Sequence, residues 1–439
     1  MKLQNHERAV PSKPNEDLEV LNFSTFCRLS ALPIILSLPA FVLPSTVLAQ
    51  QVSSVLSGPD STPNLLSSDA QEKDDLLNVD AQQGFDDWKA GIKERFGLDF
   101  GIDYNVLGYT ASSSLGERKS ASGAFRLFGT WDLVNREGPN TGSLIFKFEN
   151  RHAFTTVPPT GFGGELGYAG LNSSVFSDQG WRATHLYWQQ EFAQGRGAAY
   201  IGWLDVTDFV DVYALASPWT GFSNIAFQTG SGTIGGLPDG ALGAMVGGFL
   251  TDNIYASAGI ADANADPTDP ISGFDTLFDQ GETFKSLEIG WTSGAEALFV
   301  NNAHLTFWQI DARQQAGTPG GHGIAFSYTH VLGDAWLPFI RGGWADDGGS
   351  LYEAAVSAGF GYTRQPGRNL LGVGLNWSRP NDTTFGPNLR DQYTLEVFQQ
   401  WQLTEGLELT PSVQIIKNPA LNPNKDTVAL FGLRFRASF

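Results

Sequence analysis

Stretches in which apolar and polar side chains alternate recur between residues 85 and 439, separated by connections rich in Gly, Asn, Asp and Pro. The stretch 144–151 is the clearest, with apolar side chains on one face and Lys147, Glu149 and Arg151 on the other. Successive side chains of a β-strand point to opposite faces, so a period of two predicts strands with one apolar face. This part of the chain is therefore predicted to be all-β.

A soluble β-sandwich and a membrane β-barrel both bury one face of each strand. The alternating region is longer than one soluble core, which rarely exceeds about 250–300 residues. Divided over 16 strands it leaves roughly 22 residues for each strand and its connection, as barrels with alternating short turns and long loops require. It also ends on Phe439, the last position of an alternating stretch. We expect a transmembrane antiparallel β-barrel of 16 strands, and a secreted soluble β protein stays the alternative.

The N-terminus carries an export signal. Residues 29–43 form an apolar stretch led by Arg28, and a small-x-Ala pattern ends at Ala49. Residues 1–49 are therefore predicted to be a signal peptide that takes Cys27, the one cysteine of the chain, with it. Residues 50–84 are polar and are expected to form a flexible leader.

A short helix is predicted at the start of the region 85–439, where Phe85, Trp88, Ile92 and Phe96 follow helical spacing. The composition restricts the function as well. With 27 Lys+Arg against 46 Asp+Glu the formal net charge is −19, which argues against a nucleic-acid partner. The mean hydropathy of −0.15 argues against a bundle of membrane-spanning helices.

Short motifs that resemble enzyme, cofactor or metal sites occur in the sequence, but the residues around them do not match those sites. Residues 230–235 spell GxGxxG, but a glycine-rich stretch follows where a dinucleotide site needs a helix. Asp262, Asn264 and Asp266 begin a calcium loop whose later positions are wrong, which leaves room only for a loosely held surface cation. No histidine has the spacing of a metal site and no serine lies in a nucleophile elbow. We expect no catalytic residue, no cofactor and no metal.

Asp205, Asp208 and Asp211 follow one another at intervals of three. Paired carboxylates can act as acid and base on glycosides, so a barrel hydrolase is one alternative. The spacing suits a helical turn or a loop that folds inward, in which case the carboxylates contact a solute. A solvated acidic loop is the third interpretation.

Several stretches resemble the carbohydrate-selective outer-membrane porin family of the OprB type. These stretches are FSDQGWRATHLYWQQEF (176–192), YIGWLDVTDFVDVYALASPWTGFSNIAF (200–227), AGIADANAD (258–266) and the C-terminal block 392–439, which matches most closely. The resemblance implies a 16-stranded barrel that passes glucose-like monosaccharides into the periplasm by diffusion. Its partners would be small neutral sugars and the lipid and lipopolysaccharide of the outer membrane. Whether the barrel acts as a monomer or a trimer stays open.

Charged side chains on strands must avoid lipid, because Arg or Lys at the bilayer midplane costs about 2–4 kcal/mol. They are therefore predicted to line the lumen and to contact sugars, and a general diffusion pore without sugar selectivity is the alternative. The predicted contact residues are Lys147, Glu149, Arg151, Asp205, Asp208, Arg434 and Arg436. Further candidates are Arg341, Arg364 and Arg379. Replacing Arg434 and Arg436 by Ala is expected to raise conductance and to weaken block by sugars.

Overall fold

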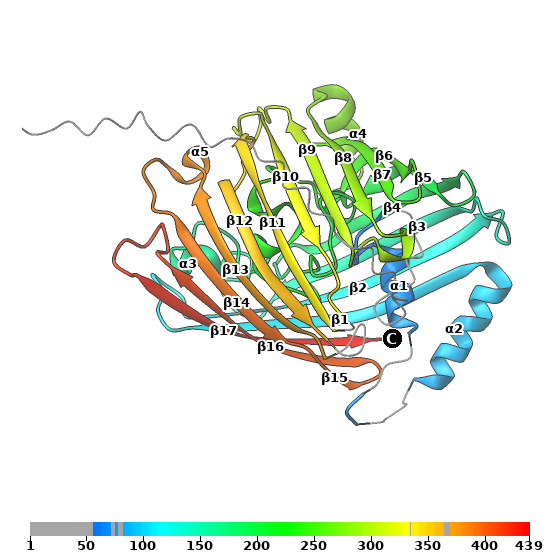
Figure 1. Cartoon of the computed structure of the whole chain (residues 1–439), viewed down its shortest axis with the longest axis horizontal. Helices are drawn as coiled ribbons and strands as arrows, with labels where there is room; N and C mark the ends of the chain where they lie inside the picture. The colour runs from blue at the N-terminus through cyan, green and yellow to red at the C-terminus, as the bar shows by residue number, and fades with distance from the viewer. Residues whose placement is uncertain (1–55, 72–74, 78–81, 334, 364–368) are drawn as a thin grey trace, which may run out of the picture. The chain divides into compact units, whose positions relative to one another are not determined.

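The strands form one closed antiparallel sheet (Figure 1). The computed structural model describes residues 56–71, 75–77, 82–333, 335–363 and 369–439. The strands are β1 (Leu98–Ala111), β2 (Lys119–Val134), β3 (Gly142–Ala153), β4 (Gly180–Phe192), β5 (Gly197–Leu204), β6 (Ala241–Phe249), β7 (Ile254–Asp262), β8 (Thr283–Thr292), β9 (Asn302–Ile310), β10 (Gly321–Thr329), β11 (Trp336–Asp347), β12 (Tyr352–Tyr362), β13 (Leu371–Pro380), β14 (Gln392–Gln399), β15 (Trp401–Thr404), β16 (Leu407–Lys417) and β17 (Thr427–Ser438).

Each strand except β14 pairs with the next along the chain, and β1 pairs with β17, which closes the sheet. Both β14 and β15 pair with β16, so β15 continues β14 beyond Gln400. The described residues therefore form a barrel of 16 strands, and the predicted fold class is confirmed. Among the described strands, closure leaves no edge of the sheet unpaired, which is the condition for crossing a membrane with strands.

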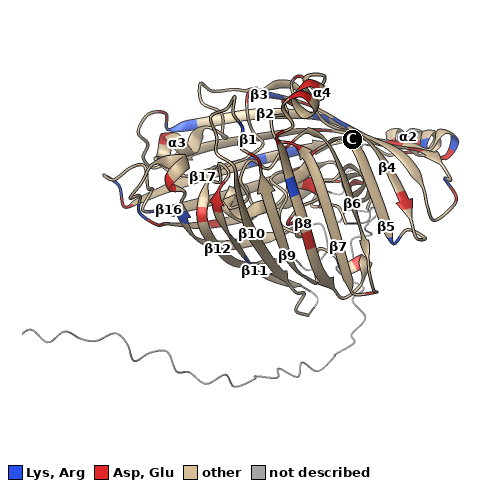
Figure 2. Cartoon of the chain, turned by 90° about the horizontal axis from the view of Figure 1, so that it is seen from above, with Lys and Arg blue, Asp and Glu red and all other residues tan. Residues whose placement is uncertain are grey.

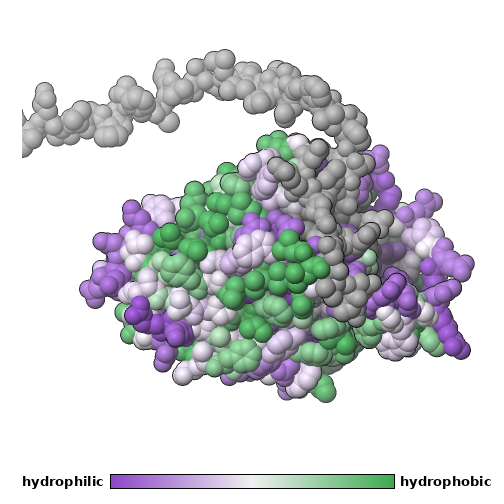
Figure 3. All heavy atoms as spheres, turned by 90° about the horizontal axis from the view of Figure 1, so that it is seen from below, coloured by the Kyte–Doolittle hydropathy of each residue, from purple (hydrophilic) through white to green (hydrophobic). Residues whose placement is uncertain are grey.

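The alternation predicted from sequence separates an inner from an outer face. On β17, Phe431 and Leu433 are exposed, whereas Arg434 and Arg436 are buried inside the barrel. Figure 3 shows one face of the molecule, where hydrophobic residues gather between hydrophilic ends. An apolar band between polar ends is typical of a lipid-facing surface. No helix among the described residues is long and apolar enough to cross a bilayer.

The helices are short. They are α1 (Thr62–Asp69), α2 (Gln83–Phe96), α3 (Phe162–Leu166), α4 (Ser272–Asp275) and α5 (Asp382–Phe385), with single turns η1 (Val206–Asp208), η2 (Ile225–Phe227), η3 (Thr229–Gly232), η4 (Thr276–Gln280) and η5 (Ala295–Ala297). The predicted helix is confirmed as α2, which lies beside the strands at the end where β1 begins (Figure 1). It carries charges of both signs, while the region around α4 is acidic (Figure 2).

Two segments fill much of the lumen. The loop between β5 and β6, residues 205–240 and called the inward loop below, packs its buried Tyr213, Trp219, Phe222 and Phe227 inside the barrel. The second is the N-terminal segment, defined here as residues 56–71, which includes α1. The barrel is thus not a wide, water-filled tube.

The N-terminal segment differs from the expected flexible leader. Leu65 and Leu66 pack on Phe128, which points inward from β2, and Arg436 on β17 binds the carboxylate of Asp69. Polar residues in this segment find buried partners inside the barrel, so their composition does not imply disorder here. The expectation is therefore wrong for 56–71. The predicted signal peptide and Arg364 lie outside the described residues.

A charged cavity inside the barrel

A cavity of about 320 Å³ lies between the wall of the barrel, the inward loop and the N-terminal segment. We call it the central cavity. Strand β3 contributes Lys147, Glu149 and Arg151, and the inward loop contributes Asp205 and Asp208. Five of the seven predicted contact residues are thus brought together in one place. Their role in binding a solute stays a prediction.

The three charges of β3 are paired with partners of opposite sign. The Lys147 ammonium lies 3.1 Å from Asp208 Oδ2 and also donates to the main-chain oxygen of Asp60 at 3.0 Å. Arg151 Nε donates to Glu149 Oε2 at 2.8 Å. Strand pleating makes this row, since positions 147, 149 and 151 share the inner face. Side chains at alternate positions therefore present cationic, anionic and cationic groups in turn.

The first turn of the inward loop places the two aspartates. Asp205 caps η1 by accepting hydrogen bonds from the main-chain N–H and the hydroxyl of Thr207, at 3.1 Å and 2.6 Å. This turn explains the interval of three between Asp205 and Asp208, because residues three apart share one side of a 3₁₀ turn. The sequence interpretation of an inward-folding loop agrees with this arrangement.

The two carboxyl groups differ in their pKa. Burial, reinforced by the nearby charge of Asp208, raises the pKa of Asp205 to about 8. Burial also pushes the pKa of Asp208 upward, but the Lys147 ammonium and His185 outweigh it and hold that pKa below its ordinary value. At neutral pH the cavity therefore holds a protonated Asp205 beside an ionised Asp208.

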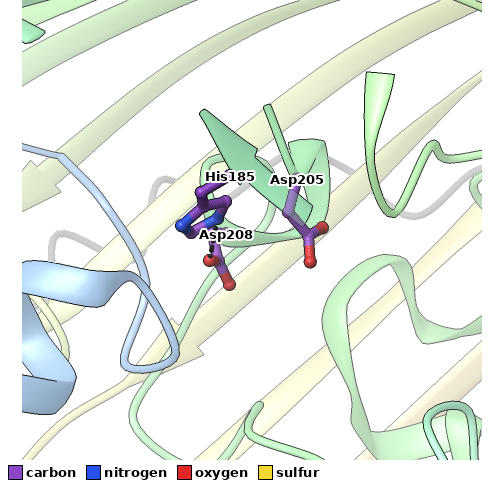
Figure 4. Close-up of side chains that lie close together, drawn as sticks. All are labelled: His185, Asp205 and Asp208. Atoms are coloured by element: carbon purple, nitrogen blue, oxygen red, sulfur yellow. Dashed lines mark ion pairs between the residues drawn. The ribbon is translucent and has the colours of Figure 1, made fainter. Parts of the chain in front are cut away.

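His185 on β4 completes this group. His185, Asp205 and Asp208 offer ligand atoms within 4.8 Å of one another, and His185 Nε2 lies 3.0 Å from Asp208 Oδ2 (Figure 4). Three such ligands can hold a metal ion. Here the Lys147 ammonium already neutralises Asp208, and a divalent cation would face its positive charge. The arrangement favours an ion pair.

A chain of polar contacts runs from Thr62 through His185 to Asp208, in the order nucleophile, base and acid that some hydrolases use. Thr62 Oγ1 lies 3.0 Å from His185 Nδ1. However, Thr62 is fully buried and does not line the central cavity, so a substrate there cannot reach its hydroxyl. The contact instead ties the N-terminal segment to β4.

The third aspartate of the series has a different function. Asp211 pairs with the buried Arg341 on β11, lies 2.9 Å from His304 on β9, and accepts the main-chain N–H of Gly230. Burial opposes ionisation of Asp211, yet Arg341 and His304 outweigh it and hold its pKa below the ordinary value. These contacts fix the inward loop to the barrel wall. Neither Asp211 nor Arg341 lines the central cavity.

Arg434 and Arg436 are buried within the barrel but do not line the central cavity. Arg434 donates to the main-chain oxygens of Pro218 and Gly221 in the inward loop, at 3.2 Å and 3.0 Å. Arg436 binds Asp69 in the N-terminal segment. The two arginines thus hold the segments that shape the cavity, and their contact with sugar stays a prediction. Arg379 is half exposed, near Glu353 and Asp391.

Sequence reasoning missed three charged or aromatic residues that line the cavity: Asp60, Trp219 and Asp239. Asp60 accepts a hydrogen bond from Ser217 at 2.6 Å, and burial, followed by the charge of Asp208, raises its pKa to about 6. Trp219 lies within a stretch that resembles the porin family. Asp60 and Asp239 gave no signal, because Asp60 belongs to a segment that reads as a disordered leader and Asp239 lies outside the resembling stretches.

Comparisons with known proteins agree with this architecture. The model of the carbohydrate-selective porin, OprB family, matches residues 160–331 and 332–439. A high-pH structure of Pseudomonas putida OprB superposes with a TM-score of 0.67 at 16% identity, over 84% of this chain and 100% of that chain. The low-pH structure of that protein has a TM-score of 0.49 at 13% identity over the same shares. A search of curated proteins finds no match.

A mutant of the Rh. blastica porin reaches a TM-score of 0.45 at 12% identity, over 78% of this chain and 100% of that chain. At 16% identity the match to the high-pH Pseudomonas putida OprB structure supports the fold alone, and it agrees with the closed barrel. The matched family residues cover more than half of the chain and include the whole inward loop. The family and the fold are those of a channel and indicate the outer membrane. This chain belongs to the OprB family of carbohydrate-selective porins.

Proposed function

We propose that this protein is an outer-membrane channel for the passive, selective diffusion of small carbohydrates, glucose-like monosaccharides, into the periplasm. The observation that carries the proposal is the central cavity, in which charges of both signs alternate along β3 and across to the inward loop. Its volume of about 320 Å³ suits one small solute, since sites for small molecules begin at about 300 Å³.

Neutral sugars fit this chemistry because each hydroxyl both donates and accepts hydrogen bonds. Lys147 and Arg151 can donate to a sugar, while Glu149 and Asp208 can accept from it. Each of these groups already has a partner in the protein, so a sugar exchanges one hydrogen bond for another and gains little net energy. Weak binding of this kind lets a solute enter and also leave, as conduction requires. The ring of Trp219 adds an apolar surface for the sugar ring.

The placement in the cell follows the same proposal. Residues 1–49 act as a signal peptide, so the mature chain begins at Gln50. The barrel domain comprises residues 85–439. The long loops 154–179 and 205–240 leave the same end of the barrel, and the connections at the other end, such as 193–196, are short. Long loops of such barrels face outside and short turns face the periplasm. Lipopolysaccharide would contact the long-loop end.

Liposome swelling tests the proposal. Purified protein in proteoliposomes is exposed to glucose, to a neutral amino acid and to a sugar acid. Glucose is expected to enter faster than the amino acid despite being larger, because only the sugar has enough hydroxyls for the paired charges. Rates that follow size alone would reduce the protein to a general diffusion pore. Protein-free liposomes give the background rate.

A further inference from the structure

The N-terminal segment separates two cavities of the lumen. Gly58, Pro59 and Asp60 line the central cavity. The next part of the segment, including Pro63 and Leu66, lines a second cavity of about 870 Å³. Among the described residues, none lines both cavities. The segment therefore forms the floor of the central cavity.

The second cavity, called the end cavity below, opens toward the short turns of the barrel. Its wall includes Asp132 near the end of β2, Thr141 before β3 and Gly195 in the turn between β4 and β5. By the placement proposed above, this is the periplasmic end. A solute that leaves the central cavity for the periplasm must therefore pass the N-terminal segment.

Polar contacts to several elements hold the segment. Its Asp60 accepts from Ser217 of the inward loop and, through its main-chain oxygen, from Lys147. Thr62 contacts His185, as described above. Asp69 accepts two hydrogen bonds from Arg436, at 2.9 Å and 2.7 Å. Specific polar contacts therefore position the segment inside the lumen.

The N-terminal segment is held by few apolar contacts and by no strand pairing, so little free energy is needed to displace it. Its helix α1 has 8 residues, and isolated helices shorter than about 12–15 residues are marginal in water. Its buried apolar side chains are Leu56, Pro63, Leu65 and Leu66. The barrel hydrogen bonds run from strand to strand and do not include the segment. Water can replace its polar contacts, so it can leave without unfolding the barrel.

We propose that the N-terminal segment, residues 56–71, is an internal gate. In place, it closes the route between the central cavity and the end cavity, and solutes pass when it withdraws toward the short-turn end. This inference rests on the proposed channel function. It adds that flux depends on the fraction of time that the segment spends outside its site.

A disulfide tests the gate directly. A Cβ atom built at Gly58 lies 3.4 Å from the Cβ of Val212 in the inward loop, close to the ~3.5–4.5 Å that disulfides span. The clash that this Cβ would make with Val212 Cγ1 disappears when both residues become cysteine. A tight contact of 3.1 Å with the main-chain oxygen of Asp208 is shared by the Gly58→Cys single variant. Cys27 is the single native cysteine and precedes the proposed cleavage site, so the Gly58→Cys/Val212→Cys protein carries only the engineered pair.

Ionic conductance of the double variant in planar bilayers is measured before and after dithiothreitol, with both single variants as controls. The oxidised protein is expected to conduct at least roughly tenfold less than the reduced protein, because the tether holds the floor in place. The single variants should not respond to the reductant. Equal conductance in both states, with the disulfide verified by thiol titration, would overturn the gate.

A second variant opens the gate instead. Asp69→Ala removes two hydrogen bonds to Arg436, which keeps Asp103 and Glu408 as partners, so the barrel wall is retained. Conductance is expected to rise several-fold, whereas Asp252→Ala, at an exposed ion pair with Arg196, leaves it unchanged. An unchanged conductance in Asp69→Ala would also count against the gate. These readouts use ions only, so they can fail independently of the sugar preference that swelling tests.

Discussion

Two strands carry rows of charge on the inner face of the barrel, and the rows serve different ends. On β3, Lys147, Glu149 and Arg151 line the central cavity. On β17, Arg434 and Arg436 reach segments that lie inside the barrel and do not line that cavity. The β3 row faces the space where a solute would bind. The β17 row donates its hydrogen bonds to the inward loop and the N-terminal segment.

This difference shows that two separate interactions act on a strand side chain. One determines whether the side chain points to the lumen or to lipid, and the other determines which partner it contacts there. Period-two alternation assigns both rows to the inner face because lipid excludes charge. What each charge meets there depends on how loops fill the lumen. Pro218 and Asp69 lie far from β17 in sequence, and no local pattern links them to it. The predictions below test this division between a lining row and a holding row.

The largest effect is expected for Arg436→Met. Arg436 pairs with Asp69, Asp103 and Glu408, and removal leaves three carboxylates without it. Breaking a buried ion pair from one side typically costs about 3–5 kcal/mol. The variant should lose its heat-dependent gel mobility shift at a lower temperature and should conduct more, since Asp69 is released.

Arg196→Met is the matched control for this variant, because it also removes one ion pair, to Asp252, but at an exposed turn. Exposed pairs contribute only about 0–1 kcal/mol, so the mobility shift should keep its wild-type temperature. If Arg436→Met behaves like this control, β17 does not hold the lumen segments.

A smaller effect is expected for Arg434→Met. The main-chain oxygens of Pro218 and Gly221 lose a charged donor, and each buried group left unsatisfied costs about 1–3 kcal/mol. The inward loop should loosen near Trp219, which raises current noise in single-channel records. Quiet, wild-type records would show that the other anchors of the loop suffice without Arg434.

The smallest effect concerns Asp205. Its pKa of about 8 lies above the ordinary value, so the group is neutral below that pH and gains a negative charge above it. Preference for K⁺ over Cl⁻, measured as the reversal potential in a KCl gradient, should therefore rise as the pH passes through about 8. In Asp205→Asn this step should vanish, whereas Asp252→Asn, at an exposed turn, should retain it. A step that persists in Asp205→Asn would assign the charge to another group.

Much of the fold could be predicted from the sequence because a barrel repeats one local rule. The alternation on β3 and β17 can be followed residue by residue in the sequence. The interval between Asp205 and Asp208 suits an inward turn, which is one of three interpretations. The N-terminal segment could not be predicted. Its polar composition predicts disorder. The partners that order it, such as His185 and Arg436, are distant in sequence and come close only in the folded barrel.

Sugar block of single channels tests the central claim that the β3 row contacts the solute. Arg151→Gln removes a charge that lines the cavity. Because the sugar exchanges the hydrogen bond between Arg151 and Glu149 for another, its net contribution is about 0.5–1.5 kcal/mol. The half-blocking glucose concentration should therefore rise about two- to tenfold, while Arg379→Gln, at a half-exposed position outside the cavity, should leave it unchanged. Equal block in wild type and Arg151→Gln would contradict the account.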